Sequence, residues 1–364
     1  MRLPTLLLLI ASVASRADQH TKNVILFLAD AGGISTLHAA SLHGYGDTRK
    51  LFVQSMPHIG LSDTSTASNW VSDSAAGMTA VVTGRKTHNG VVSQSDAAVR
   101  GKADGAPLKT ILEYAEEKGL STGIITNMAF FDATPAACYA QVNDRGATAK
   151  IVTQFLNPRF GDGVDVLIGA GRKRALEAAQ SAGLDYDDEL RKRQYRVIDS
   201  LNALEPGVSR VAAIFDSGAF DVAEALRKTI RVLSRNPKGY FLMVEWDAHT
   251  DKPAAGLDRV LAFDRAIRET AKAVSPKDTL LLFTADHSFD LRTVGGRRGE
   301  PVLPPAGEDK TEKPAKPALK VEGSHTGEEV LVAAQGPGAG RVRGYLDNTQ
   351  LFGIMMDAYG WKRK

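Results

Sequence analysis

Short apolar runs alternate with amphipathic stretches along most of this chain. The strand-like runs are Asn23–Ala29, Leu120–Thr126, Val164–Ile168, Val211–Phe215, Tyr240–Val244, Thr279–Thr284 and Val330–Ala334. The helix-like stretches that follow most of them are Leu108–Lys118, Arg172–Ala182, Phe220–Ser234 and Leu257–Ala273. Near-continuous apolar strands that alternate with helices are typical of a parallel sheet covered on both faces. The pattern therefore predicts an α/β fold with a large, mostly parallel sheet.

The N-terminus departs from this pattern. Arg2 supplies a positive charge, an apolar run covers Leu6–Ala14, and Ser12–Ala14 has the small-x-small form of a cleavage site. These features predict a signal peptide over residues 1–18 and export, to the periplasm or as a secreted protein. The apolar run is too short to span a bilayer comfortably, so no stable membrane insertion is expected.

A second departure covers about residues 292–323. This segment is rich in Pro, Gly, Lys and Glu and lacks apolar periodicity. It predicts a flexible surface loop inserted into a single catalytic domain of residues 19–364.

Composition narrows the class of protein. The 364 residues are 43% hydrophobic and 24% charged, which is an ordinary globular balance. A net charge of only +3 gives no reason to expect a nucleic acid partner. Cys138 is the sole cysteine, so neither an internal disulfide nor a thiolate zinc site can form. Any metal must be held by Asp, Glu, His or hydroxyl groups.

Acidic residues and histidines gather where the predicted strands end, which is where ligands bind in such sheets. The residues concerned are Asp30, then Glu245, Asp247, His249 and Asp251, then Asp286 and His287, and finally His325 before the last strand. Each segment alone has a plain structural reading, such as Asp30 capping a helix or His325 filling a structural role. Together they would repel one another without cations. A single centre that binds several metal ions would explain all of these segments together, and such centres commonly catalyse in-line phosphoryl displacement.

Two further residues are candidates for a nucleophile and for a phosphate-binding group. Ser74 falls at a predicted helix start among small residues, where backbone N–H groups favour an anion. The alternative is that Asp73 or Ser74 only caps that helix. Arg145 follows the segment Asp132–Pro135, and a guanidinium fork can bind two phosphate oxygens, although alone it reads as a surface residue.

Four of these segments resemble the alkaline phosphatase family, in the family's order. They are Asp73–Ala76, Asp132–Pro135 with the trailing Arg145, Thr284–His287 and Ser324–Gly327. Gly84–Gly90 also resembles the stretch after the family's nucleophile helix, and the likeness runs from Asn23 to about Gly360. The resemblance implies a three-layer α/β sandwich with a large, mostly parallel central sheet flanked by helices. Family members are often dimers, so a homodimer is an expectation.

The resemblance also implies roles for individual residues. Ser74 would form a phosphoserine intermediate, and Arg145 would clamp the non-bridging phosphate oxygens. Of two zinc ions, one would activate Ser74 and the other would stabilise the leaving oxygen. The implied ligands of the first zinc are Asp30, Asp286 and His287, and those of the second are His249, His325 and a carboxylate. The implied ligands of one magnesium ion are Asp30, Thr134 and Glu245, with Asp132 nearby.

The sequence differs from the family at the second zinc site. The family usually spaces the Asp and His of that site four apart and several residues beyond the Glu. Here Asp247 is only two residues before His249, and Glu245 is four before it. The distance from His249 to Asp264 agrees with the usual spacing. Asp247 is the first candidate for the missing carboxylate and Asp251 the second.

These observations predict hydrolysis of small phosphate monoesters. A phosphodiesterase of the same superfamily is one alternative, and a non-catalytic periplasmic phosphate- or metal-binding protein is another, although the latter has no need for Ser74. A sulfatase is disfavoured, because the setting of Cys138 does not match the Cys/Ser-x-Pro-x-Arg pattern of those enzymes.

Overall fold

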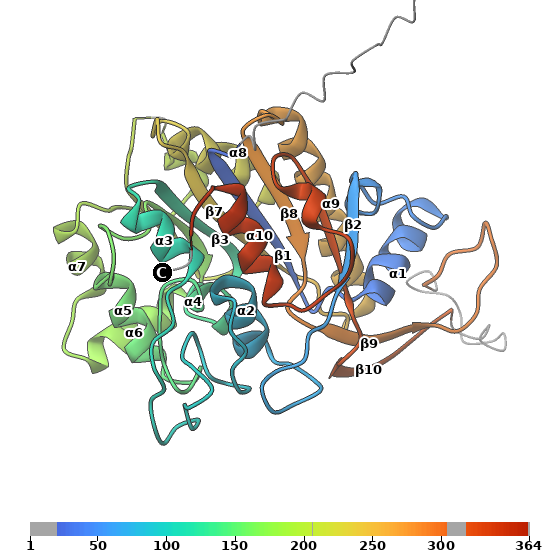
Figure 1. Cartoon of the computed structure of the whole chain (residues 1–364), viewed down its shortest axis with the longest axis horizontal. Helices are drawn as coiled ribbons and strands as arrows, with labels where there is room; N and C mark the ends of the chain where they lie inside the picture. The colour runs from blue at the N-terminus through green and yellow to red at the C-terminus, as the bar shows by residue number, and fades with distance from the viewer. Residues whose placement is uncertain (1–19, 206, 304–317, 363–364) are drawn as a thin grey trace, which may run out of the picture.

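The computed structural model describes residues 20–205, 207–303 and 318–362. A ten-stranded sheet runs through the molecule in the order β12-β2-β11-β8-β1-β7-β3-β4-β6-β5 (Figure 1). Its strands are β1 Asn23–Asp30, β2 His58–Ser62, β3 Ser121–Ala129, β4 Val166–Ala170, β5 Arg196–Ile198, β6 Val211–Ile214, β7 Tyr240–Asp247, β8 Thr279–Thr284, β11 Val330–Gln335 and β12 Gly344–Leu346. Neighbouring strands are parallel except where β11 pairs with β2 and β8. The predicted mostly parallel sheet is confirmed.

Helices cover both faces of this sheet. Figure 1 shows α2, α3 and α10 in front of it and α1, α8 and α9 behind it. The helices behind are α1 Ile34–Tyr45, α8 Val222–Leu233 and α9 Pro253–Ala273. Those on the other face are α2 Ser74–Thr83, α3 Ile111–Glu117, α4 Ala133–Ala136, α5 Thr148–Leu156, α6 Arg172–Ser181, α7 Tyr186–Lys192 and α10 Gln350–Ala358. Short 3-10 turns lie at Val53–Ser55, Leu201–Ala203 and Ala339–Arg341.

The central strand β1 shows why the sheet needs two helical layers. Because side chains alternate along a strand, Val24, Leu26 and Leu28 join the core cluster that includes Met78 of α2. Ile25 and Phe27 point the other way, into the cluster with Leu257 of α9. Both sets are fully buried. The expected three-layer α/β sandwich is therefore confirmed.

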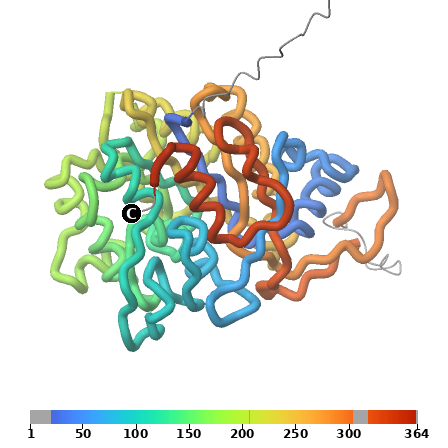
Figure 2. The backbone as a smooth tube through the Cα atoms, in the orientation of Figure 1, coloured from blue at the N-terminus to red at the C-terminus, as the bar shows by residue number. Residues whose placement is uncertain are grey.

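The segment 292–323 differs from its prediction at both ends. Ser288–Thr293 forms β9 and Leu319–Thr326 forms β10, and these two strands pair antiparallel in a separate sheet beside α1 (Figure 2). The prediction of an irregular loop is wrong there, because apolar and charged residues alternate along β10. Arg292 also binds Glu322 across the pair at 2.6 Å. Residues 304–317 of this segment, and the predicted signal peptide at 1–18, lie outside the described residues.

No helix within the described ranges is long and apolar enough to cross a membrane.

The sheet also decides where chemistry can gather. β1 lies between β7 and β8, and the carboxyl ends of these parallel strands meet at one edge. Asp30 is the register partner of Asp247, and Leu28 is the partner of both Glu245 and Thr284. The polar residues that follow the strands are thereby brought together although they lie far apart in the sequence.

Gly77 allows helix α2 to approach the loop after β8. A Cβ atom at this position would lie 2.4 Å from the backbone oxygen of Asp286. We expect Gly77→Ala to lower the free energy of unfolding by about 1–3 kcal/mol, because the clash outweighs the higher helix propensity of alanine. Urea denaturation measures this. The control is Gly340→Ala, whose Cβ would meet its nearest atom at 3.8 Å. Equal stability of the two variants would contradict the prediction.

Candidate active site

The buried centre of the candidate site combines the ends of β1 and β8. Ligand atoms of Asp30, Asp286 and His287 lie within 4.8 Å of one another. Nε2 of His287 is 3.4 Å from Oδ1 of Asp30 and 3.6 Å from Oδ2 of Asp286. All three side chains are buried. The structure thus brings together the three residues expected to hold the first zinc ion.

Backbone N–H groups fix the Asp286 carboxylate in this centre. Its Oδ1 accepts hydrogen bonds from the N–H of Ala31 at 3.2 Å and from that of His287 at 3.1 Å. Ala31 has a φ of 64°, a left-handed conformation that is uncommon for a residue with a Cβ. This turn directly after β1 aims its N–H at the neighbouring strand end and ties Asp30 to Asp286.

Several carboxylate oxygens in the centre have no donor. Oδ1 of Asp30, Oδ2 of Asp286 and Oε1 of Glu245 are buried and accept no hydrogen bond from described residues. Burial, followed by the charges of Asp286 and Glu245, raises the pKa of Asp30 well above its usual value. Burial likewise raises the pKa of Glu245 to about 8. Buried acceptors that lack donors and repel one another fit hard or borderline divalent cations.

The ring orientation of His287 suits a metal ligand. Its Nδ1 lies 3.1 Å from the backbone oxygen of Ser288, and a hydrogen bond there places the proton on Nδ1. Nε2 then presents its lone pair to Asp30 and Asp286. The same Nε2 lies 3.3 Å from Oγ of Ser74. His287 is therefore the residue that joins the carboxylate centre to the predicted nucleophile.

A second group consists of three histidines. Ligand atoms of His249, His287 and His325 lie within 4.8 Å of one another. The His287 and His325 rings stack with centroids 3.8 Å apart, and Nδ1 of His325 lies 3.2 Å from the backbone oxygen of Ser72. Burial and the neighbouring His287 lower the pKa of His325, which favours the neutral form that binds metals. His325, predicted from a single short motif, thus joins the site.

Asp247 lies beside His249, whereas Asp251 does not join either group. Oδ1 of Asp247 is 2.9 Å from Nδ1 of His249 and also accepts the backbone N–H of that residue at 2.9 Å. Burial acts to raise the pKa of Asp247, but the His249 hydrogen bonds and the charge of Arg259 hold it below its usual value. Asp251 is exposed. This geometry favours Asp247 over Asp251 as the carboxylate of the second site.

Arg259 is a functional candidate that the sequence did not reveal. It extends from α9, donates to the backbone oxygens of Asp247 at 2.8 Å and His249 at 2.9 Å, and lies 3.0 Å from Oδ2 of Asp247. Three contacts from one guanidinium hold the short Asp247–His249 turn. The sequence did hold one signal for this role. Arg259 lies in the second turn of α9, which begins shortly after Asp247 and His249.

Ser74 is the first residue of α2, which begins as predicted. Asp73 caps the helix by accepting the N–H of Ala76 at 3.1 Å, and every residue of α2 is buried. Ser74 itself is 4% exposed. Asp73 therefore caps the helix, as the alternative interpretation of this segment stated. Ser74 does not serve as the cap, and its hydroxyl contacts His287 instead.

Arg145 lies between two carboxylates close to Ser74. Its Nη1 is 3.1 Å from Oδ2 of Asp73, and its Nη2 is 2.9 Å from Oδ1 of Asp132. The guanidinium is a quarter exposed, so it remains open to a ligand. The plain surface reading of Arg145 is wrong, because both of its partners adjoin the site.

Glu245 faces the β3 side of the site. Thr126 donates a short hydrogen bond to its Oε2, and Thr134 lies close enough to act against the rise in the pKa of Glu245. The charges of Asp132 and Asp286 act on it from either side. Thr134 and Glu245, two of the three residues expected to hold magnesium, are therefore neighbours, with Asp132 close by. Thr126 was not predicted, since a threonine inside an apolar strand carries no distinctive signal.

Comparison with known proteins identifies the family. The alkaline phosphatase family model matches residues 21–203 and 221–306. The chain is 28% identical to the tissue-nonspecific alkaline phosphatase of Felis catus, with 92% of this chain and 83% of that protein covered. It is 29% identical to streptomycin-6-phosphate phosphatase of Streptomyces griseus, with 98% and 95% covered.

Solved structures show the same fold. Alkaline phosphatase from Thermus thermophilus superposes with a TM-score of 0.79 at 21% identity, covering 99% of this chain and 97% of that one. Alkaline phosphatase from the Antarctic bacterium TAB5 gives a TM-score of 0.77 at 22% identity, covering 95% and 99%. The family match spans most of the chain, and it agrees with the serine, arginine and carboxylate geometry described above. The chain therefore belongs to the alkaline phosphatase family and is a phosphomonoester hydrolase.

Proposed function

We propose that this enzyme hydrolyses small phosphate monoesters through a phosphoserine intermediate on Ser74. The observation that carries the proposal is the contact of the Ser74 hydroxyl with His287, beside a buried carboxylate centre in which three oxygens lack donors among the described residues. Arg145 lies on the other side of the same helix start, where it can receive the phosphate.

We propose three cation sites. One zinc ion would be held by Asp30, Asp286 and His287. The ligands of a second zinc ion would be His249, His325 and Asp247, and those of a magnesium ion would be Asp30, Thr134 and Glu245, with Asp132 nearby. Such cations, when bound, lower the pKa of hydroxyl groups and stabilise the charge on phosphoryl oxygens. The unsatisfied buried oxygens of Asp30, Asp286 and Glu245 support cation binding here.

The protein's own residues would act as follows. The bond from Oγ of Ser74 to phosphorus forms as the ester bond breaks, and the departing alcohol takes up the proton that the serine loses. Water then hydrolyses the phosphoserine, which restores the hydroxyl and releases inorganic phosphate. The backbone N–H groups at the start of α2 and the guanidinium of Arg145 stabilise the negative oxygens of the phosphoryl group.

Arg145 supports monoesters over diesters as substrates. A guanidinium fork that binds two oxygens suits a phosphoryl group with several unesterified oxygens. Asp73 and Asp132 hold the fork near the Ser74 hydroxyl without burying it. No contact in the described part of the chain favours the phosphodiesterase alternative.

We also propose that the protein is exported, that residues 19–364 form a single catalytic domain, and that the enzyme is a homodimer. These three statements stay predictions from the sequence.

Replacement of Ser74 by alanine tests the nucleophile. Ser74→Ala should abolish labelling by a radioactive phosphomonoester at acidic quench and lower kcat/KM by about a thousandfold or more. Ser68→Ala is the control, because Ser68 lies on the exposed loop before the helix and its hydroxyl contacts Asn69 and His88, which have no assigned role in the site. Undiminished labelling in Ser74→Ala would refute the assigned role.

Removal of cations tests the metal centre. A chelator should abolish turnover and lower the free energy of unfolding by about 3 kcal/mol relative to saturation at a hundred times Kd. Added zinc and magnesium should restore both. Asp286→Asn should reduce the zinc found by elemental analysis, while Asp258→Asn, an exposed residue paired with His43, should not. Full activity after exhaustive chelation would rule the centre out.

Arg259 can be tested as a positioning residue for the second site. Arg259→Met removes three contacts but keeps much of the aliphatic length, so we expect zinc affinity to fall about ten- to a hundredfold. Isothermal titration of the metal-depleted protein measures the affinity directly. Arg265→Met, an exposed arginine on the same helix, is the control. Identical zinc affinities in the two variants would count against the role.

A further inference from the structure

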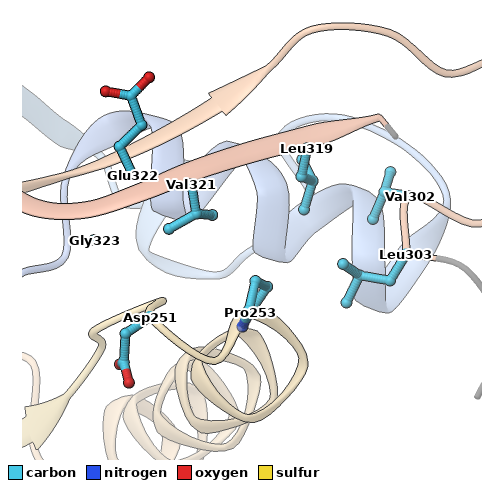
Figure 3. Close-up of a pocket in the computed structure, with 8 residues that line it drawn as sticks. All are labelled: Asp251, Pro253, Val302, Leu303, Leu319, Val321, Glu322 and Gly323. Carbon is cyan, nitrogen blue, oxygen red and sulfur yellow. The ribbon is translucent and has the colours of Figure 1, made fainter. Parts of the chain in front are cut away.

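A hollow of about 410 Å³ opens between β10 and the start of α9 (Figure 3). Its walls are the side chains of Pro253, Val302, Leu303, Leu319 and Val321. The volume lies within the range of small-molecule sites and is ample for a short alkyl chain or an aromatic ring. None of the roles assigned above uses this hollow.

The hollow is apolar because of the alternation along β10. Leu319 and Val321 line it, whereas Lys320 does not, and Glu322 lines it alongside them. Glu322 is neutralised there by Arg292 at 2.6 Å and Lys320 at 2.8 Å. Figure 3 shows the carboxylates of Asp251 and Glu322 directed away from the space between the apolar side chains. An uncharged, apolar group is therefore the occupant that this hollow suits.

The hollow adjoins two of the site's histidines. Gly323, at its edge, is two residues before His325, and Asp251 is two residues after His249. Two residues span at most about 7 Å, so the Cα atoms of both histidines lie within that distance of residues that line the hollow. Phe289 packs its ring against His249 at 5.1 Å and against His325 at 6.3 Å between centroids. Phe289 thus gives the two histidines an apolar neighbour.

The alcohol part of the substrate would leave on the side of the site where the hollow lies. Ser74 contacts His287, the third histidine, and in-line displacement places the departing oxygen opposite the attacking one. The family resemblance implies that the ion held by His249 and His325 would stabilise the departing oxygen. The organic group attached to that oxygen would then extend past these two residues, away from Ser74 and toward Val321.

We propose that the hollow is the subsite for the alcohol part of the substrate, and that the enzyme favours monoesters of apolar alkyl or aryl alcohols. This inference rests on the proposed function, because it needs the alcohol to leave on the side of His249 and His325. The apolar group gains binding energy from burial against Leu319 and Val321.

The test compares hexyl phosphate with methyl phosphate, because their leaving alcohols have similar acidity and differ mainly in apolar length. We expect Val321→Asp to lower the ratio of their kcat/KM values about tenfold, through a higher KM for hexyl phosphate. Val294→Asp is the matched control, since Val294 directly follows β9, is 57% exposed and does not line the hollow. Hexylphosphonate should lose inhibitory affinity in Val321→Asp alone, whereas methylphosphonate should not.

The outcomes separate this subsite from the underlying function. A wild-type enzyme that hydrolyses neither ester would refute the proposed function and the subsite with it. Normal methyl phosphate turnover with the same ratio in wild type, Val321→Asp and Val294→Asp would overturn the subsite alone. If Val321→Asp loses methyl phosphate turnover through misfolding, the comparison is made with Val321→Ala and Val294→Ala. A ratio that is equal in those two variants would likewise overturn the subsite.

Discussion

The structure depends on burying several carboxylates at one edge of a parallel sheet. Asp30, Glu245 and Asp286 lie at the carboxyl ends of β1, β7 and β8, where nearly all water is excluded. Burial and mutual repulsion raise the pKa values of Asp30 and Glu245, and no lysine or arginine among the described residues forms an ion pair with either. A protein seldom keeps such an arrangement unless cations compensate for it. The proposed cation sites would therefore be a consequence of where the strands end.

Acidic residues nearer the surface have arginine partners from the protein itself. Arg145 contacts Asp73 and Asp132, and Arg259 contacts Asp247. The inner carboxylates have no such partner among the described residues. The outer carboxylates are thus neutralised by arginine side chains. The inner carboxylates would be neutralised by the proposed cations. This division also keeps Arg145 partly exposed, which agrees with the proposal that this side chain binds and releases an anion.

The parts of the fold that follow from periodicity were predictable, and the parts that depend on long-range contacts were not. The apolar run of β1 and the cap at Asp73 are local signals, and both elements form where expected. Sheet pairing then brought Asp30, Asp286 and His287 together, as strand-end reasoning predicted. The β9–β10 pair was missed because its strands are joined by a polar segment and pair only with each other. Arg259 was missed because its contacts reach from a helix to a turn.

The short spacing of Asp247 and His249 has a physical explanation in the turn that they form. Asp247 ends β7, and its Oδ1 accepts the backbone N–H of His249, which folds the chain back directly after the strand. A longer connection between carboxylate and histidine would need more residues to reach the same place. Arg259 holds the backbone oxygens of both residues, so α9 replaces the support that a longer loop would give itself. In this short turn the positions of Asp247 and His249 thus depend on a side chain of α9, so the proposed second zinc site would depend on α9 as the proposed first site depends on β1 and β8.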